Sequence, residues 1–267
     1  MYAMTETVSI AIETSCRRGG CALGLGQTIV ASIAFDASQR HTAMLLGHMD
    51  SLLKQRQLRP ADLNEVYISA GPGSFTGLRV GVTVARTLVQ AIAHVRCVAV
   101  PTAQAVAQNA AGMEWERLAV VMDAGEGFIY GTFFTRQAGQ IVQAGPSTVL
   151  PAAEFAAQLP GDILLIGEGL HYHLPALQAV CGAGVSPACG AGVPPASRCL
   201  PRGLPGEGIR MLPEDSPLNF PTAEGVWAVG RQLAQAGQYT DYHQLLPIYS
   251  RAPQALRAWE QKQSNKT

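Results

Sequence analysis

Alternating and continuous apolar runs at the start of the chain predict three consecutive β-strands, at residues 8–12, 21–25 and 29–35. Apolar residues then recur at spacings of three and four over residues 42–57, which predicts an amphipathic helix. The next predicted elements are a strand at 66–70, a helix at 78–95, a strand at 97–100 and a helix at 103–111. Three strands in a meander, followed by strands joined through helices, differ from the strict alternation of a Rossmann fold.

The same pattern partly repeats in the second half of the chain. Strands are predicted at 118–123, 127–135, 140–150 and 162–166, with helices at 151–158 and after Gly167. Thr222 is a good N-cap for a last helix, which we expect to pack on the first lobe. We therefore predict an α/β fold of the actin-like ATPase and ribonuclease H-like superfamily, with two duplicated lobes that each hold a mixed sheet flanked by helices. The expected division is 1–103 with helix 221–237, 104–220, and a C-terminal tail at 238–267.

A tandem octad lies outside this pattern. Residues 181–188 are CGAGVSPA and residues 189–196 are CGAGVPPA, within a tract rich in Gly, Pro and Ala that runs to about residue 208. Two copies of eight residues are too few for a solenoid. We interpret the tract as an inserted surface loop that takes no part in the chemistry.

Composition and charge restrict the class of protein. Hydrophobic residues make up 48% of the chain and charged residues 14%, which favours a well-packed globule with part of its surface covered by a partner. The formal net charge of zero argues against nucleic-acid binding by this chain alone, since that task normally needs a basic face. No apolar run approaches the ~20 residues of a membrane span, and the N-terminus lacks a secretory signal pattern. We expect a cytoplasmic protein that does not associate with membranes.

The sharpest local motif is a glycine-rich loop between a predicted strand and helix, AGPGSFTGLR at residues 70–79. Backbone amides and hydroxyls at a helix N-terminus, with an arginine nearby, can cradle an anion. A tight turn that only seats the helix explains the same residues equally well. The loop is not a Walker motif, because the Gly-Lys-Ser/Thr ending is absent. The candidate residues are Gly71, Gly73, Ser74, Thr76 and Arg79.

Two corners begin with an acidic residue at the end of a predicted strand. Glu13, Thr14 and Ser15 can hold a phosphate or a magnesium-bound water, or can make hydrogen bonds within the turn only. Asp123 begins the matching corner of the second half. A ribonuclease H-type nuclease needs several carboxylates that converge on two metals, and the strand at 66–70 ends in no acid.

The histidines and cysteines do not form a recognisable metal site. His41 and His48 lie seven residues apart, whereas zinc-binding helices use spacings of three or four. His171 and His173 are expected to be solvated. Cys16, like Cys21 and Cys97, is expected to be a free thiol that behaves as a small hydrophobe.

Five blocks of sequence together resemble the TsaB (YeaZ) family over nearly the whole chain, the octads excepted. They are IAIETS, ISAGPGSFTGLRVGVTVARTL, VPTAQAVA, VVMDAGEGFIYGTFF and PIYSRAPQA. That family is the dimerisation-type subunit of bacterial threonylcarbamoyladenosine synthesis on tRNA. The resemblance implies an actin-like fold, a cytoplasmic location, and association with the catalytic paralogue TsaD, the ATPase TsaE and, through the complex, tRNA. The complex attaches threonylcarbamoyl to N6 of adenosine 37 in tRNAs that read codons starting with adenine.

The resemblance also implies that this chain is the non-catalytic partner. In the paralogue, a His-x-x-x-His metal site follows the strand after the Gly-Pro-Gly block, whereas residues 101–109 here are PTAQAVAQN. We therefore expect no catalytic residue and no metal ligand. Cys16-Arg17-Arg18 and Gly125-Glu126 depart from the family's usual corners, which argues against ATP or ADP with magnesium in the cleft of the isolated chain.

The resemblance further implies that the helices at 42–57 and 78–95 pack against the paralogue, and the same surface would favour homodimers when this chain is alone. The expected contacts are Met44, Leu45, His48, Met49, Leu52, Leu78, Val82, Arg86 and Val89. The leading hypothesis is thus a scaffold that binds and activates TsaD. The alternatives are a nucleotide-hydrolysing enzyme of the actin-like and sugar-kinase superfamily and, less favoured, a metal-dependent peptidase.

Overall fold

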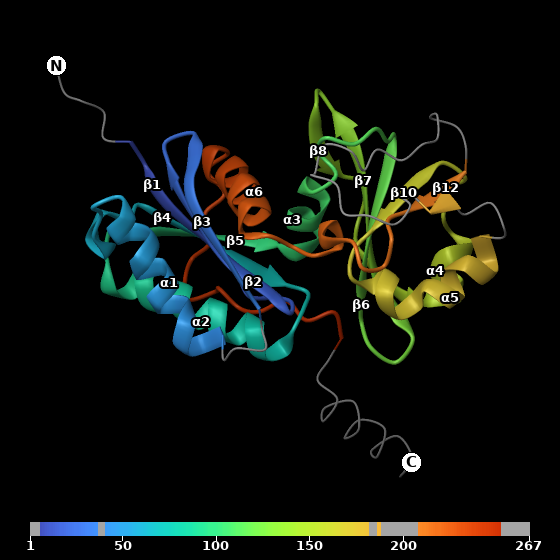
Figure 1. Ribbon diagram of the computed structural model, residues 1–267, viewed down its shortest axis with the longest axis horizontal. Helices are drawn as coiled ribbons and strands as arrows, with labels where there is room; N and C mark the ends of the chain where they lie inside the picture. The colour runs from blue at the N-terminus through green and yellow to red at the C-terminus, as the bar shows by residue number, and fades with distance from the viewer. Residues whose placement is uncertain (1–5, 37–40, 182–185, 188–207, 252–267) are drawn as a thin grey trace, which may run out of the picture.

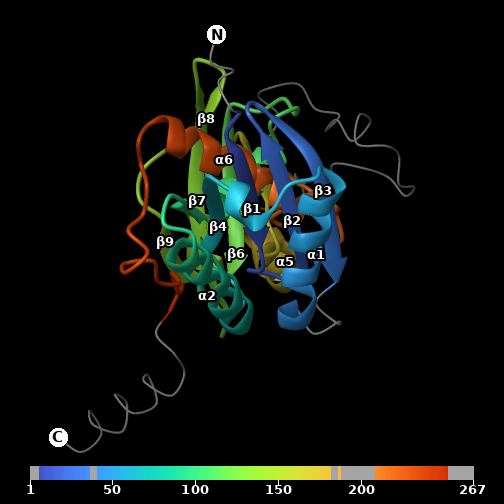
Figure 2. The ribbon, with the colours of Figure 1, turned by 90° about the vertical axis from the view of Figure 1, so that its left-hand side faces the viewer.

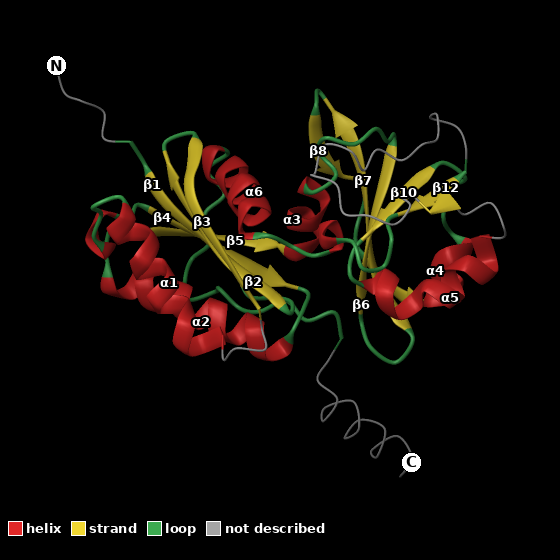
Figure 3. Ribbon diagram, in the orientation of Figure 1, coloured by secondary structure: helices red, strands yellow, loops and turns green. Residues whose placement is uncertain are grey.

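Two mixed β-sheets, each flanked by helices, form two lobes that lie side by side (Figure 1; Figure 3). The computed structural model describes residues 6–36, 41–181, 186–187 and 208–251. The octads at 181–196 lie almost entirely outside the described residues, as do residues 252–267 of the expected tail.

The first sheet has the strand order β3-β2-β1-β4-β5. Its strands are β1 (Val8–Glu13), β2 (Arg18–Leu25), β3 (Thr28–Asp36), β4 (Glu65–Gly71) and β5 (Arg96–Pro101). The meander β1-β2-β3 is antiparallel, whereas β4 pairs in parallel with both β1 and β5. Parallel neighbours need a crossover connection, and α2 (Phe75–Ala91) supplies it between β4 and β5, while α1 (His41–Gln55) leads from β3 towards β4.

The second sheet repeats this arrangement. Its strands are β6 (Arg117–Asp123), β7 (Phe128–Gln137), β8 (Gln140–Gln143), β9 (Thr148–Pro151), β10 (Ile163–Ile166), β11 (Ser186–Pro187) and β12 (Ile209–Met211). β6 takes the place of β1, because it is antiparallel to β7 and parallel to β10, which in turn is parallel to β12. The order β8-β7-β6-β10-β12 therefore reproduces β3-β2-β1-β4-β5, and the predicted duplication is confirmed.

Helices and sheets alternate in layers across the molecule (Figure 1; Figure 2). α1 and α2 cover the outer face of the first sheet, and α6 (Ala223–Gln235) covers its other face. α3 (Thr102–Gln108) lies between the two sheets and contacts strands of both. α4 (Ala152–Ala157) and α5 (Gly169–Cys181) pack together on the second sheet. The described residues also include short 3-10 helices at Pro60–Asp62 and Pro217–Asn219.

Two predicted elements needed correction. The strand predicted at 140–150 is two strands, β8 and β9, which both pair with β7. The chain turns between them at Gly145, whose φ of 86° lies in the left-handed region that favours glycine. The helix predicted at 78–95 begins three residues earlier, because the Ser74 hydroxyl accepts a hydrogen bond from Gly77 N and caps α2. Thr222 caps α6 as predicted.

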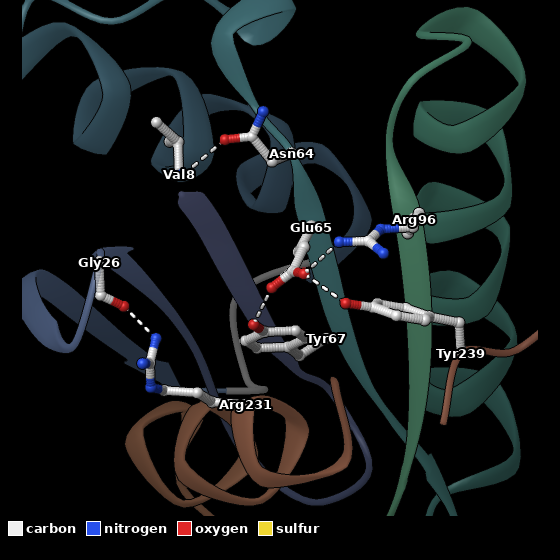
Figure 4. Close-up of polar contacts among 8 residues, drawn as sticks. All are labelled: Val8, Gly26, Asn64, Glu65, Tyr67, Arg96, Arg231 and Tyr239. Atoms are coloured by element: carbon white, nitrogen blue, oxygen red, sulfur yellow. Dashed lines mark hydrogen bonds and ion pairs between the residues drawn. The ribbon is translucent and has the colours of Figure 1, made fainter. Parts of the chain in front are cut away.

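A buried polar network ties the segment after α6 to the first sheet (Figure 4). The Glu65 carboxylate accepts hydrogen bonds from the hydroxyls of Tyr67 and Tyr239, the latter at 2.8 Å. It also pairs with Arg96 at 3.1 Å, and the Arg96 guanidinium lies 3.9 Å from the centre of the Tyr239 ring. Burying a carboxylate without such partners costs several kcal/mol, so these contacts hold the C-terminal segment in a defined place.

Candidate functional site

The carboxyl ends of equivalent strands meet where the two lobes join. Glu13 ends β1 and Asp123 ends β6, its counterpart in the second sheet. The glycine loop at 71–73 follows β4, and residues 167–169 follow β10, which is the counterpart of β4. Ligands of open α/β sheets bind outside the carboxyl ends of the strands. This junction is therefore the candidate functional site.

Glu13 is fully buried, and only one of its two carboxylate oxygens is hydrogen-bonded. Its Oε1 accepts hydrogen bonds from the backbone N (2.5 Å) and the hydroxyl (2.6 Å) of Ser15. Its Oε2 has no hydrogen-bond partner among the described residues. Burial raises the pKa of Glu13 to about 7, and the bonds from Ser15 together with the nearby Ser69 hydroxyl oppose that rise. The side chain therefore exchanges a proton near neutral pH.

A second carboxyl with a raised pKa faces Glu13 from the other lobe. Burial raises the pKa of Glu168 to about 7, and the negative charges of Asp123 and Glu13 raise it further, while Arg17 opposes them. These interactions show that the three carboxyls from the two lobes lie within electrostatic reach of one another. The turn after Gly167 was predicted, but no feature of the sequence marked Glu168 as a site residue.

Asp123 is hydrogen-bonded to His173, which the sequence analysis expected to be solvated. His173 Nε2 lies 2.8 Å from Asp123 Oδ1, and Gly125 N donates to the same oxygen at 3.1 Å. The bond with His173 is the largest cause that lowers the pKa of Asp123. The expectation that His173 is solvated is wrong, because its side chain is buried against β6, whereas His171 is exposed. His173 lies in the first turn and a half of α5, so the β10–α5 connection brings it to the end of β6.

The glycine loop packs against the first acidic corner. Ser74 N donates to Ser15 O at 2.5 Å, and the Thr14 hydroxyl donates to Gly77 O at 2.8 Å. A Cβ atom at Gly73 would collide with Ser15 O, and one at Gly77 would collide with Thr14 O. These contacts favour the interpretation that the glycines permit close packing of the loop against residues 14 and 15.

Two further loop residues lie on the surface. Thr76 is exposed, and so is Arg79. The Arg79 guanidinium lies 3.7 Å from the centre of the Phe75 ring, and its Nε donates to the Tyr249 hydroxyl at 3.4 Å. Within the described part of the chain, Arg79 thus contacts α2 and the C-terminal segment rather than the acidic corners.

The side chains expected to contact a partner divide into two groups. Five of them are buried, namely Leu45, Met49, Leu52, Leu78 and Val82, and all of these except Leu78 belong to the core between the helices and the first sheet. Met44, His48, Arg86 and Val89 are partly exposed. His48 stacks on Phe35 with ring centroids 5.2 Å apart. Leu46, which was not among the expected contacts, is 56% exposed on α1. A partner that approached these helices would therefore contact Leu46 and the partly exposed group, since the buried five face this chain's own sheet.

The cysteines of the described lobes are buried free thiols. These thiols are Cys16, Cys21 and Cys97; Cys181, which ends α5, has a side chain outside the described part of the structure. Burial raises the pKa of Cys21 and of Cys97 to about 12, so these thiols are protonated and unreactive at neutral pH. No group of three or more His, Cys, Asp or Glu side chains within the described ranges is arranged to hold a metal ion.

None of the helices in the described parts of the chain is both long and apolar enough to cross a membrane.

Known proteins resemble this chain over nearly its whole length. The family model of TsaD, tRNA N6-adenosine threonylcarbamoyltransferase, matches residues 33–179. The tRNA threonylcarbamoyladenosine biosynthesis protein TsaB of Bacillus subtilis is 25% identical over 95% of this chain and 98% of its own length. The protein of the same name from Escherichia coli is 26% identical over 60% of this chain and 71% of its own length. These matches confirm the resemblance to TsaB.

Solved structures show the same fold. YeaZ from Pseudomonas aeruginosa superposes with a TM-score of 0.69 at 23% identity, covering 91% of this chain and 99% of that one. A second Pseudomonas aeruginosa structure, described as similar to the peptidase YEAZ, gives a TM-score of 0.70 at 22% identity, covering 92% of this chain and 100% of that one. The duplicated two-lobe α/β fold predicted from the sequence is therefore the fold of YeaZ.

Proposed function

The chain belongs to the family of TsaD, tRNA N6-adenosine threonylcarbamoyltransferase, and on this premise we propose that it serves threonylcarbamoyladenosine biosynthesis as a non-catalytic partner subunit. A relative that matches over nearly its full length carries the name tRNA threonylcarbamoyladenosine biosynthesis protein, which supports the pathway. In this proposal the chain binds and activates the catalytic paralogue TsaD. TsaE and tRNA join the same complex, which modifies N6 of adenosine 37 in tRNAs that read ANN codons.

The observation that carries the non-catalytic role is the composition of α3. This helix follows β5, at the place where the resemblance implies metal ligands in the catalytic paralogue. It has the sequence TAQAVAQ, and most of its side chains are buried between the lobes. Thr102 uses its hydroxyl in a 2.8 Å hydrogen bond with Ser69. A helix of this kind offers neither a nitrogen nor a carboxylate ligand to a metal.

The exposed faces of α1 and α2 are the proposed docking surface for TsaD. Leu46 is 56% exposed on α1, and the partly exposed Val89 and Arg86 lie on α2, which contacts α1. Exposed apolar side chains with an arginine beside them are typical of interface centres. The five buried side chains of the same helices support this face from beneath and would not touch the partner.

A matched pair of variants tests the docking surface. Leu46→Glu places a charge on the proposed surface, and Tyr172→Glu places one on α5 of the other lobe, where Tyr172 is 49% exposed. We expect co-purification with TsaD to be lost for Leu46→Glu and retained for Tyr172→Glu, with both unfolding midpoints close to that of the wild type. Retention of TsaD by both variants would show that another surface is used. Failure of the wild-type chain to bind TsaD would remove the partner proposal itself.

Nucleotide hydrolysis remains the alternative function. It is less favoured because three carboxyls gather at the junction and would repel a phosphate, with Arg17 offsetting only part of their charge at Glu168, and because Ser15 O already accepts from the N-cap residue of α2. Calorimetric titration of the purified chain with Mg-ATP tests this alternative. Binding of Mg-ATP with a dissociation constant in the micromolar range would support nucleotide hydrolysis. The absence of any heat of binding would eliminate it.

A further inference from the structure

The segment after α6 follows the first lobe before it reaches the second. Thr240 is bonded to the free edge of β5, since its N donates to Cys97 O at 2.8 Å and its hydroxyl accepts from Ala99 N at 3.0 Å. Leu245 is buried in the first core. Ile248 N donates to Ala70 O at 2.6 Å, at the start of the glycine loop. The segment is drawn in red in Figure 1.

Side chains two positions apart in this segment contact opposite lobes. The Tyr249 ring packs on Phe75 of α2 with centroids 4.8 Å apart. Arg251 contacts the second lobe in three ways: its Nη1 donates to Gly125 O at 3.2 Å, it pairs with Glu126 at 3.1 Å, and it lies 4.2 Å from the centre of the Phe128 ring. Residues 248–251 therefore bridge the glycine loop of one lobe and the acidic corner of the other.

The two main-chain connections between the lobes are hydrogen-bonded to each other just after α3. One passes through α3, and the other runs from β12 to α6. The Asn109 side chain, just after α3, donates to Leu218 O at 2.9 Å and to Phe220 O at 2.8 Å. Adjacent connections of this kind allow rotation about a single line. Residues 248–251 make a third crossing, at the ends of β4 and β6, which restrains that rotation.

We propose that residues 248–251 are an interlobe strap that fixes how far the corner bearing Asp123 stands from the corner bearing Glu13. The proposal rests on these contacts alone and is independent of the proposed function. The strap is releasable, because the Glu126 side chain is 52% exposed and that of Arg251 is 21% exposed, so solvent screens the ion pair. Release would open the junction without unfolding either lobe.

Hydrogen exchange of the full-length chain, read by mass spectrometry, tests the strap. Arg251→Ala removes the contacts to the second lobe. Arg59→Ala is the matched control, because Arg59 forms its 3.2 Å pair with Asp62 inside the first lobe. The observed amides are those of the 124–128 corner, where Ala124 N and Phe128 N are bonded within the turn. Exchange of the amides in strands β1 and β6 reports global unfolding of the chain.

We expect Arg251→Ala to raise exchange at 124–128 and 248–250 by about threefold or more while β1 and β6 stay protected. Arg59→Ala should leave all of these segments at wild-type rates. Unchanged exchange at 124–128 in Arg251→Ala would overturn the proposal. A uniform rise that includes β1 and β6 would also overturn it, because Arg251 would then support global stability and not the relation between the lobes.

Discussion

Replacement of Glu13 by glutamine tests the acidic junction most sharply. Glu13 is fully buried, and only its Oε1 is bonded, to the N–H and hydroxyl of Ser15. Glutamine keeps an acceptor oxygen for Ser15 and removes the charge. The new amide group takes the place of Oε2, which has no partner in the described structure, and any cost of this is independent of pH.

The expected magnitude follows from the raised pKa. Burial moves the pKa of Glu13 from 4.5 to about 7. Between these values the folded state binds more protons than the unfolded state, so stability falls as pH rises through that window and then levels off. At about 1.4 kcal/mol per pKa unit, ionisation of this one group costs on the order of 3 kcal/mol.

The assay is urea unfolding of the wild type and of Glu13→Gln at several pH values. The unfolding free energy of the variant minus that of the wild type should increase by about 3 kcal/mol between about pH 4.5 and about pH 8. Groups remote from Glu13 cancel in this difference. Glu168 does not cancel, because the Glu13 charge raises its pKa, and the loss of that charge also favours the variant at high pH. A difference that is flat with pH would refute the reasoning, because it would mean that Glu13 titrates as a solvated carboxyl.

Three further predictions concern other contacts. Glu65→Ala leaves Arg96 and two tyrosine hydroxyls without their acceptor and should lower the unfolding free energy by about 3 kcal/mol in urea titrations; a loss below about 1 kcal/mol would contradict a structural role for the network. Gly77→Ala should lower the unfolding free energy by about 2 kcal/mol or more, because its Cβ would collide with Thr14 O. Gly47→Ala, which has open space around it in α1, should raise the unfolding free energy by up to about 1 kcal/mol. Equal effects of the two variants in thermal unfolding would contradict the close packing at Gly77. Asp123→Asn removes a negative charge that raises the pKa of Glu168, and the pKa of Glu168 should therefore fall below about 7. An unchanged titration of the Glu168 carboxyl by NMR would contradict the proximity of the two groups.

Local patterns were sufficient to predict most of the fold. The apolar alternation predicted the meander of β1 to β3, and the N-cap of α6 was apparent in Thr222. β12 was missed because a three-residue strand after a Pro/Gly-rich tract has no periodicity to detect. The pairing of β8 and β9 with one partner depends on the turn at Gly145, whose conformation the sequence suggests only weakly.

The candidate site was less predictable, for two physical reasons. Glu168 and His173 acquire their importance from tertiary contacts with the other lobe and with β6, and isolated acids and histidines are common on surfaces. The helices α1 and α2 carry apolar residues on more than one face, so spacing alone could not separate Leu45, which faces the sheet, from Leu46, which faces solvent.

The central claim is that this chain supports TsaD without catalysing the reaction. Its most direct test is transfer of threonylcarbamoyl from an added activated threonylcarbamoyl donor to an unmodified tRNA by the host's TsaD and TsaE, in the presence and absence of this chain. The modified nucleoside is measured by mass spectrometry. We expect modification only when TsaD and this chain are both present, and none from this chain alone. Full modification without this chain, or modification by this chain without TsaD, would contradict the claim.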